Sequence, residues 1–334
     1  MERSADGTTS ADQTNTSVVE NLCSGEQALI TDRIDAITRI SKEYRGTFLP
    51  APKSVKIELT ATCNYKCSFC TKSLNNHEDG HMDKALYMRL IREMHDAGVE
   101  ELGVFFIGES FTCKWLPDAI WEAKKVGFPY VFLTTNGSAA TPDRVRQCMA
   151  AGLDSLKFSL NFHSPEQLAD VAKVSPTYWR RSIENLKAAK TIRDAGDYSC
   201  KLYASSIKFD GEQGQAMQAV VDEITPHVDQ HYWLPLYGMS GASKAAGWKP
   251  GPGNPGRLDA MRDPLPCWSV FTEGHITKDG IMSACCFGGA GLEMADLKTD
   301  KFMDGWNSIR YQKLRAAHLS KDVTGTQCAE CAAA

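Results

Sequence analysis

The stretch Thr62-Cys63-Asn64-Tyr65-Lys66-Cys67-Ser68-Phe69-Cys70 closely follows an alternating apolar run at Val55–Leu59. Its three cysteines have the spacing C-x3-C-x2-C, and a loop of this kind can wrap three thiolates around one iron–sulfur cube. Because a cube holds four irons, three thiolates leave one iron free to bind another molecule. The alternative is a structural zinc ion, with His77 or His81 as its fourth ligand. We expect an iron–sulfur site after the first strand of the fold.

Composition and charge exclude several classes of protein. A net charge of -4 over 334 residues gives no overall attraction to nucleic acid or to an anionic membrane. The sequence contains no apolar run of about 18 residues that would span a bilayer, and residues 1–24 lack the apolar core of a secretory signal, so we expect a cytoplasmic protein. Twelve cysteines in such a protein indicate metal binding rather than disulfides. Five are scattered and are expected to be small buried side chains: Cys23, Cys113, Cys148, Cys200 and Cys286.

Apolar periodicity predicts six strands that alternate with helices after residue 53. The predicted strands are 53–59, 102–107, 130–133, 155–160, 198–207 and 228–236. The predicted helices are 84–97, 115–126, 142–151, 178–195 and 213–224. This order predicts an α/β fold, a partial (β/α)6 barrel of the TIM type, whose functional groups gather where the strands end.

The remaining segments give the domain boundaries that we predict. Residues 1–24 are polar and expected to be disordered. Residues 25–52 form an amphipathic helix and a lead-in to the barrel, which occupies 53–237. A Gly/Pro-rich linker or lid follows at 238–264, and a small second domain at 265–334.

A second group of cysteines lies in that last domain. The turn Lys278-Asp279-Gly280 predicts a hairpin of strands 270–277 and 281–286, and a helix follows at 309–319. Four thiolates in such a domain suit either a zinc ribbon or a further iron–sulfur cluster. In chain order these cysteines are Cys267, Cys285, Cys328 and Cys331.

Together the motifs resemble the radical S-adenosylmethionine (radical SAM) family, over roughly Val55–Cys331. In that family the cysteines that correspond to Cys63, Cys67 and Cys70 bind a [4Fe–4S] cluster, whose open iron chelates the methionine part of S-adenosylmethionine. The resemblance implies reductive cleavage of S-adenosylmethionine to a 5′-deoxyadenosyl radical, which abstracts hydrogen from a substrate. It also implies an external electron donor such as flavodoxin or ferredoxin.

The same resemblance implies the contacts to S-adenosylmethionine. An aromatic residue before the last cysteine, here Phe69, is part of the family pattern. The run Gly108-Glu109-Ser110 is similar to the family's Gly-Gly-Glu-Pro region, in which the carboxylate takes the methionine amino group. Polar residues after the third and fourth strands correspond to contacts with the ribose and the methionine carboxylate. The implied cofactor-binding residues are Tyr65, Phe69, Gly108, Glu109, Ser110, Thr135, Asn136, Ser159 and Asn161.

The second cysteine group resembles the twitch subdomain, a shortened form of the SPASM extension in this family. The resemblance implies that these four cysteines bind one auxiliary [4Fe–4S] cluster, which makes two clusters in the chain. Cys286 adjoins Cys285, so it is either an alternative ligand or a thiol hydrogen donor.

Residues 82–87, Met-Asp-Lys-Ala-Leu-Tyr, resemble a segment of the 2-deoxy-scyllo-inosamine dehydrogenases of this family. The resemblance implies oxidation of a sugar or aminocyclitol carbinol to a ketone in antibiotic biosynthesis, with the auxiliary cluster accepting an electron. Lys157, on a polar face of the fourth strand, is the candidate base, with a surface lysine as the alternative.

Three other functions stay open. One is a redox-neutral epimerase or decarboxylase, in which Cys286 could return a hydrogen. Another is a peptide maturase, although no strand-rich segment that suits a peptide-binding domain precedes Val55. The last is an iron–sulfur scaffold that does not cleave S-adenosylmethionine.

Overall fold

The computed structural model describes residues 29–74, 77–237, 242–245, 247, 265–287 and 291–333. The predicted disordered segment 1–24, with Cys23, lies outside these residues, as does most of the linker or lid predicted at 238–264. In the described ranges, no helix combines the length and the apolar character needed to cross a membrane.

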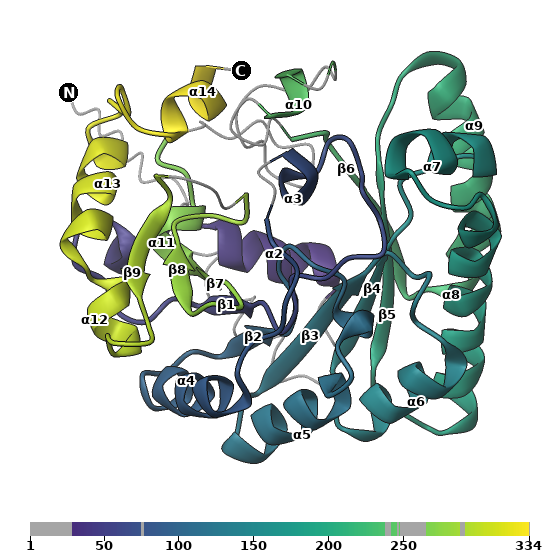
Figure 1. Cartoon of the computed structure of the whole chain (residues 1–334), viewed down its shortest axis with the longest axis horizontal. Helices are drawn as coiled ribbons and strands as arrows, with labels where there is room; N and C mark the ends of the chain where they lie inside the picture. The colour runs from purple at the N-terminus through teal and green to yellow at the C-terminus, as the bar shows by residue number, and fades with distance from the viewer. Residues whose placement is uncertain are drawn as a thin grey trace, which may run out of the picture.

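One sheet of nine strands runs through the molecule in the order β6-β5-β4-β3-β2-β1-β7-β8-β9 (Figure 1). All pairs from β6 to β7 are parallel, and β7, β8 and β9 pair antiparallel. The strands are β1 (Ser54–Ile57), β2 (Glu101–Gly103), β3 (Tyr130–Thr135), β4 (Ser155–Ser159), β5 (Lys201–Ile207), β6 (Gln230–Leu234), β7 (Glu273–Ile276), β8 (Ile281–Ser283) and β9 (Glu293–Asp296). The parallel order of β1 to β6 confirms the predicted α/β partial barrel.

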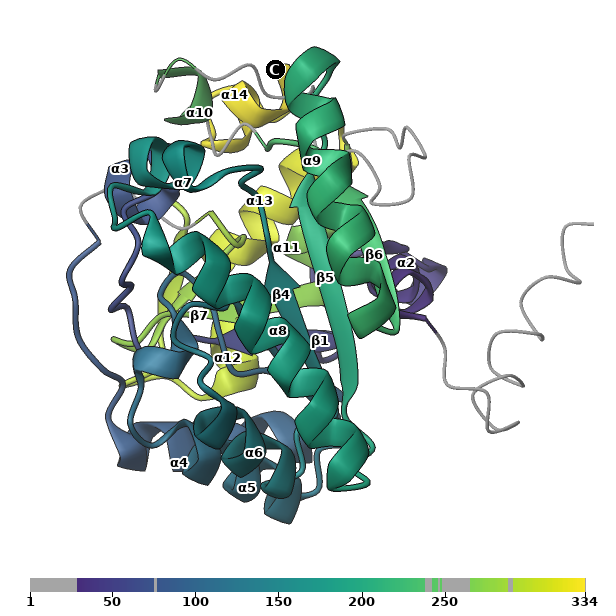
Figure 2. The same cartoon turned by 90° about the vertical axis from the view of Figure 1, so that its right-hand side faces the viewer.

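Helices that follow the strands cover the outer face of the sheet (Figure 2). They are α4 (Lys84–Asp96), α5 (Leu116–Val126), α6 (Pro142–Ala150), α8 (Thr177–Ala195) and α9 (Gly211–Ile224). Val55 and Ile57 alternate with Lys56 along β1, and they share one core with Leu90 and Ile91 of α4. The other helices are α2 (Ile30–Thr38), α3 (Thr71–Leu74), α7 (Pro165–Ala172), α10 (Ala242–Ala245), α11 (Ser269–Thr272), α12 (Phe302–Trp306), α13 (Ile309–Leu319) and α14 (Cys328–Ala333).

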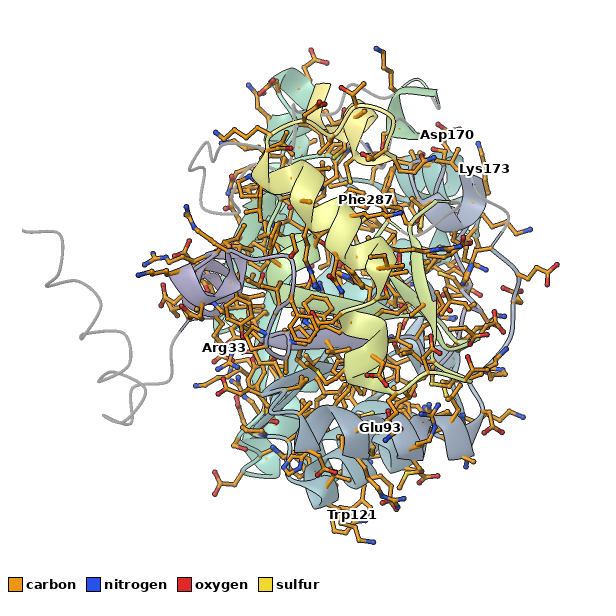
Figure 3. The ribbon with its side chains drawn as sticks, turned by 90° about the vertical axis from the view of Figure 1, so that its left-hand side faces the viewer. Arg33, Glu93, Trp121, Asp170, Lys173 and Phe287 are labelled. Carbon is orange, nitrogen blue, oxygen red and sulfur yellow. The ribbon has the colours of Figure 1, made fainter. Side chains whose placement is uncertain are left out.

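The inner face of the barrel carries polar side chains. A Cβ added at Gly103 would lie 3.1 Å from Cγ of Lys56 and 2.9 Å from Cζ of Phe132, so these side chains share one space. Helix α2 lies against the first residues of the strands, where Arg33 pairs with Glu101 (Figure 3). The Arg33 guanidinium also lies 3.4 Å from the centroid of the Tyr130 ring. Helix α2 therefore covers the end of the barrel at which the strands begin.

The hairpin of the second domain continues the barrel sheet. Strand β7 pairs in parallel with β1, with Ser54 opposite Glu273 and Lys56 opposite His275. The pairing joins segments that are far apart in the chain, so the sequence did not reveal it. It brings Glu273 and His275 next to Lys56.

Several predicted strands are shorter in the structure: 198–207 begins only at Lys201, and 281–286 ends at Ser283. Strand β2 ends at Gly103 instead of residue 107, because the chain turns there and Ser110 Oγ donates a hydrogen bond to the Val104 carbonyl (2.9 Å). In the hairpin, Ser269–Thr272 form the short helix α11, so the first strand begins only at Glu273.

Sequence analysis missed helix α7 and strand β9. The sequence did contain the start signal of α7: Ser164 accepts a hydrogen bond from the Gln167 backbone N–H (3.1 Å), and Pro165 occupies the first turn. Strand β9 pairs antiparallel with β8 and completes a three-stranded meander with β7.

Candidate functional site

The first cysteine loop is held under helix α7. The Lys66 N–H donates to the Ala172 carbonyl (2.9 Å), and the Ser68 N–H donates to the Val171 carbonyl (3.0 Å). The aromatic rings of the loop are also covered. Tyr65 stacks on Tyr178 with centroids 6.2 Å apart, and Phe69 stacks on Phe162 with centroids 6.4 Å apart. Helix α7 thus restricts the access of water to the thiols.

The three thiols of this loop influence one another electrostatically. Burial, with the negative charges of Glu109 and Cys70, raises the pKa of Cys63 to about 12. Burial, followed by the charges of Cys70 and Cys63, raises the pKa of Cys67 well above its usual range. Three partly buried thiols that must ionise together need a cationic partner, so the donor set fits an iron–sulfur cluster.

One of the two fourth ligands considered for a zinc ion, His77, is engaged elsewhere. His77 Nε2 lies 3.0 Å from Glu58 Oε2, so His77 is engaged by a carboxylate. Within the part of the chain that the structure describes, no group of three or more His, Cys, Asp or Glu side chains is gathered tightly enough for one metal ion. A cube binds each thiolate on a different iron, so its ligands lie further apart than those of one zinc ion.

Glu109 lies in a turn beside the loop. Its Oε1 accepts from Thr135 Oγ1 (2.8 Å) and Phe111 N–H (3.1 Å), and its Oε2 accepts from Asn136 N–H (2.7 Å). Burial raises the pKa of Glu109, whereas these donors lower it. A carboxylate has about four acceptor positions, so one stays available for an ammonium group. Ser110 has a backbone contact instead, through its bond to Val104.

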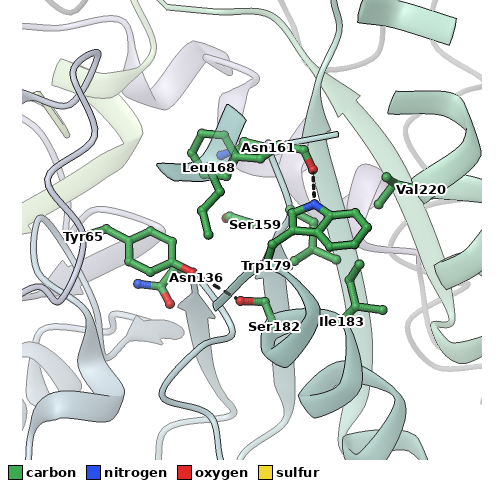
Figure 4. A pocket seen from close by; sticks show the side chains of 11 residues that line it. Tyr65, Asn136, Ser159, Asn161, Leu168, Trp179, Ser182, Ile183 and Val220 are labelled. Carbon is green, nitrogen blue, oxygen red and sulfur yellow. Dashed lines mark hydrogen bonds between the residues drawn. The ribbon is translucent and has the colours of Figure 1, made fainter. Parts of the chain in front are cut away.

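Four of the implied cofactor-binding residues line one small cavity at the ends of β3 and β4 (Figure 4). Trp179 Nε1 donates to the Phe162 carbonyl (2.8 Å), and the Tyr65 hydroxyl lies 3.3 Å from Ser182 Oγ. The four residues are Tyr65, Asn136, Ser159 and Asn161. The side chain of Thr135 points instead to Glu109.

The second cysteine group gathers around α11, the end of β8 and α14. Burial, followed by the charges of Cys286, Cys267 and Cys328, raises the pKa of Cys285 well above its usual range. Burial, followed by Cys267, Cys328 and Cys286, raises the pKa of Cys331 to about 12. Five thiols therefore lie within electrostatic reach, and both Cys285 and Cys286 can be ligands.

Both cysteine groups lie at the same end of the molecule. Helix α7, marked by Asp170 and Lys173, and Phe287, next to Cys286, lie at the end opposite to Trp121 (Figure 3). Helices α3, α7 and α14 share this end in the other two ribbon views (Figures 1 and 2). This is the end at which the barrel strands finish, where such folds build their sites.

Lys157 faces the interior of the barrel. It lines a cavity of about 100 Å³, and its Nζ lies 5.8 Å from the centroid of the Tyr232 ring. Strand β4 therefore has the register in which the Lys157 side chain points into the barrel, not the register that would make it a surface lysine. Lys56 and Glu273, which the sequence analysis did not single out, line the same cavity.

Comparison with known protein families agrees with this arrangement. The model of the Radical SAM superfamily matches residues 57–196. The SPASM model, an iron–sulfur cluster-binding domain, matches residues 267–332. Residues 57–196 are therefore a radical SAM domain, and residues 267–332 a SPASM domain. The SPASM domain contains the whole second cysteine group, and these families imply S-adenosylmethionine, a [4Fe–4S] cluster and auxiliary iron–sulfur binding.

Curated relatives match less than half of this chain. An S-adenosylmethionine-dependent nucleotide dehydratase of Lacinutrix mariniflava is 26% identical over 144 residues, 40% of this chain and 30% of that protein. A PqqA peptide cyclase of Streptomyces rochei is 26% identical over 147 residues, 44% of this chain and 38% of that protein. The chain thus spans about a third of the length of these relatives.

Two solved structures share the fold. SuiB of Streptococcus suis bound to S-adenosylmethionine has a TM-score of 0.63 at 14% identity, over 90% of this chain and 77% of that one. BtrN in complex with AdoMet and 2-DOIA has a TM-score of 0.51 at 15% identity, over 80% of this chain and 86% of that one. At these identities the similarity concerns the fold.

Proposed function

We propose that this chain is a radical SAM oxidoreductase that oxidises a carbinol of a sugar or aminocyclitol to a ketone. The observation that carries the proposal is the presence of two groups of partly buried cysteines at one end of a barrel whose interior is polar. A radical generator needs the first group, and a net oxidation needs an acceptor for the second electron. The complex of BtrN with AdoMet and 2-DOIA, which has this fold, supports a small-molecule substrate.

The residues of the chain bind and enclose the cofactors in this proposal. When bound, S-adenosylmethionine and two [4Fe–4S] clusters supply a hydrogen-abstracting radical and an electron acceptor. The free acceptor position of Glu109 receives the methionine amino group, and Asn136 and Thr135 hold that carboxylate in position. Helix α7 and its aromatic contacts exclude water, which would otherwise quench a radical. The ligands are Cys63, Cys67 and Cys70 for the first cluster, and Cys267, Cys285, Cys328 and Cys331 for the second.

Oxidation of a carbinol removes one hydrogen atom, one proton and one electron. The hydrogen atom leaves from carbon, the electron goes to the auxiliary cluster, and the proton leaves from the hydroxyl group. We keep Lys157 as the candidate proton acceptor, because general-base catalysis needs a titratable group that can reach the hydroxyl, and Lys157 points into the barrel.

The decisive experiment is reductive cleavage of S-adenosylmethionine. Anaerobically reconstituted protein is incubated with dithionite and S-adenosylmethionine, and 5′-deoxyadenosine is measured by chromatography. Wild type should form it, and Cys67→Ala should not. Absence of 5′-deoxyadenosine from wild type, both alone and with sugars or aminocyclitols, would sink the proposal.

An epimerase is the second candidate, because Cys286 lies within electrostatic reach of the auxiliary site and could return a hydrogen atom. The two reactions respond oppositely to two substitutions. Loss of product in Cys286→Ala with normal product in Cys328→Ala favours epimerisation. The reverse pattern favours dehydrogenation, which needs the auxiliary cluster but not a thiol donor.

A peptide maturase is the third candidate, because several curated relatives are named PqqA peptide cyclase. Stimulation of 5′-deoxyadenosine formation separates it from the others. A polyol substrate should raise the rate in the proposed reaction, whereas a peptide encoded next to the gene should raise it in a maturase.

A further inference from the structure

His318 lies beside the first cysteine of the auxiliary site. It belongs to the last turn of α13, is only 1% exposed, and its Nδ1 accepts a hydrogen bond from the backbone N–H of Cys267 (3.2 Å). The His318 ring also packs edge-on against Phe271 of α11, with ring centroids 6.3 Å apart. The ring is therefore held between α11 and α13, against the backbone of a proposed cluster ligand.

The contact with Cys267 decides which nitrogen of the His318 ring carries the proton. A backbone N–H can only donate, so Nδ1 is the acceptor in this hydrogen bond and has no hydrogen of its own. In a histidine, the hydrogen bond made by one ring nitrogen sets the state of the other, and the hydrogen is then on Nε2. His318 therefore presents an Nε2–H donor.

This donor has no partner in the part of the chain that the structure describes. Nε2 of His318 is buried, yet it makes no hydrogen bond there. Buried donors are nearly always paired, because an unpaired N–H loses its hydrogen bond to water without a replacement. The exception indicates an acceptor that these residues do not supply.

The thiols of the auxiliary site gather around Cys267. Burial is the main cause of the raised pKa values of Cys285, Cys328 and Cys331, and the negative charge of Cys267 contributes to all three. A cluster held by these four thiolates would lie next to Cys267, and therefore close to the ring that contacts the Cys267 backbone. The sulfur atoms of such a cluster accept hydrogen bonds.

We propose that Nε2–H of His318 donates a hydrogen bond to a sulfur atom of the auxiliary cluster, either a sulfide or a ligating thiolate. Reduction adds negative charge to these sulfur atoms, so a donor stabilises the reduced cluster more than the oxidised one. His318 thereby raises the reduction potential and makes the cluster a better electron acceptor. The inference rests on the cluster that the SPASM domain implies, and it does not depend on the substrate.

Two substitutions separate the roles of the two ring nitrogens. In His318→Asn, the shorter amide can keep an acceptor for the Cys267 N–H, but no group occupies the position of Nε2. In His318→Gln, the longer amide supplies an N–H donor near that position. His81→Asn, at an exposed histidine of the barrel, is the control.

The midpoint potential of the auxiliary cluster is the first measurement. The full-length parent protein carries Cys63→Ala, Cys67→Ala and Cys70→Ala, so that only the auxiliary cluster is observed. After anaerobic reconstitution, it is titrated with titanium(III) citrate and redox mediators, and the EPR signal of the reduced cluster is followed.

His318→Asn should lower the equilibrium constant for reduction about tenfold relative to the parent, which is about 59 mV for one electron. His318→Gln and His81→Asn should stay near the parent. An unchanged potential in His318→Asn overturns the inference. An equal decrease in His318→Asn and His318→Gln also overturns it, because the decrease would then follow from lost packing of the ring.

Pulsed EPR of the parent protein is the second measurement, and it does not require any His318 variant to bind iron. With isotope-labelled histidine, Nε2 of His318 should give a nitrogen hyperfine coupling to the reduced cluster. Absence of this coupling overturns the inference, as does a parent protein that binds no auxiliary cluster by iron analysis. Failure of wild type to form 5′-deoxyadenosine overturns the proposed function instead, because neither measurement uses S-adenosylmethionine.

Discussion

Asn136 and Asn64 hold each other at the end of β3, where Asn136 Nδ2 donates to Asn64 Oδ1 at 2.9 Å. Asn64 Nδ2 donates to Ser138 Oγ (2.8 Å), and Ser138 Oγ donates to Asn136 Oδ1 (2.7 Å). The three bonds form a closed ring between the cysteine loop and the segment that also holds Glu109. These hydrogen bonds therefore fix the position of the first cysteine loop relative to the Glu109 carboxylate.

Replacing Asn64 by Ala should loosen the cysteine loop. The change breaks two of the three bonds, which are worth about 1 kcal/mol each. We expect a chelator to remove iron faster from the reconstituted Asn64→Ala variant than from wild type. The decay of the absorbance band of the cluster measures this rate. Ser138→Ala is the matched control: it also breaks two of the three bonds, but it keeps the direct Asn136–Asn64 bond to the cysteine loop and should therefore have a smaller effect. Equal rates for Asn64→Ala and wild type would contradict a positioning role.

Gly108 should tolerate no side chain. A Cβ at this position would collide with the carbonyl oxygen of Thr60 and approach Ala61 Cα within 2.9 Å. Gly108→Ala must therefore push the Glu109 turn away from the end of β1, so we expect at least about a tenfold loss of S-adenosylmethionine affinity, by analogy with other displaced site groups. Equilibrium dialysis measures this. Gly46→Ala, whose Cβ would meet its nearest atom at 3.3 Å, should bind normally.

Iron analysis should distinguish Cys285 from Cys286. The Cys285 thiol is influenced by Cys286, Cys267 and Cys328, and the charge of Cys286 acts on Cys331. We expect Cys285→Ala to lose about four irons per chain, one cube, and Cys286→Ala to keep them. The opposite result would assign the ligand role to Cys286 and remove it as a hydrogen donor.

Local patterns predicted most of the barrel. The apolar alternation of β1 and the Gly or Pro ends of α5 and α6 located these elements within a few residues. The cysteine spacing located the site, because a short loop fixes which thiols meet.

The parts that sequence analysis missed depend on long-range packing. Nothing local to Glu273 indicates that β7 pairs with β1, so its approach to Lys56 could not be foreseen. The sequence did contain one usable signal. Lys56 alternates with apolar residues in a strand that is otherwise buried, and this alternation places its side chain on the inner face of the barrel. Asn64 lay inside the quoted motif, but its partner on β3 depends on the tertiary fold.

His231 should make stability depend on pH. It lies 3.1 Å from Ser206 Oγ, its ring packs edge-on against Trp233, and burial lowers its pKa to about 4. The unfolded ring has a pKa of about 6.5, so the unfolded chain binds the proton first as pH falls. Stability from this ring is complete above about pH 6.5 and is lost as pH falls toward 4.

His231→Gln should therefore lose less stability than wild type between pH 7.5 and 5.5. Because the ring is only half-buried, the difference should be about 1 kcal/mol. Urea midpoints at the two pH values measure it. The exposed His81, changed to Gln, is the control and should leave the wild-type pH dependence intact. The same pH dependence in His231→Gln and wild type would show that another group is responsible.

Arg315 should be the most sensitive single residue in the attachment of the second domain. Its fully buried guanidinium donates to the carbonyl groups of Val270 (2.9 Å), Thr47 (3.0 Å) and Trp306 (2.9 Å) and to Asn307 Oδ1 (3.1 Å). Burial lowers its pKa to about 10, so the cation is retained at neutral pH.

Replacement of Arg315 by Met keeps the apolar contact with the Trp306 ring but removes the guanidinium donor from three buried carbonyl groups and from Asn307 Oδ1, which still accepts from the Leu49 N–H. Several lost hydrogen bonds to a charged group should cost about 3–5 kcal/mol of unfolding free energy. Arg310→Met is the matched control, because Arg310 lies on the same helix, is exposed and donates to the Glu293 carbonyl (3.1 Å). In urea denaturation, the midpoint of Arg315→Met should lie far below that of wild type, and the midpoint of Arg310→Met should lie close to it. Similar midpoints for the two variants would mean that the four bonds are replaced by water, and that the lead-in to the barrel is held by Trp306 and Asn307 alone.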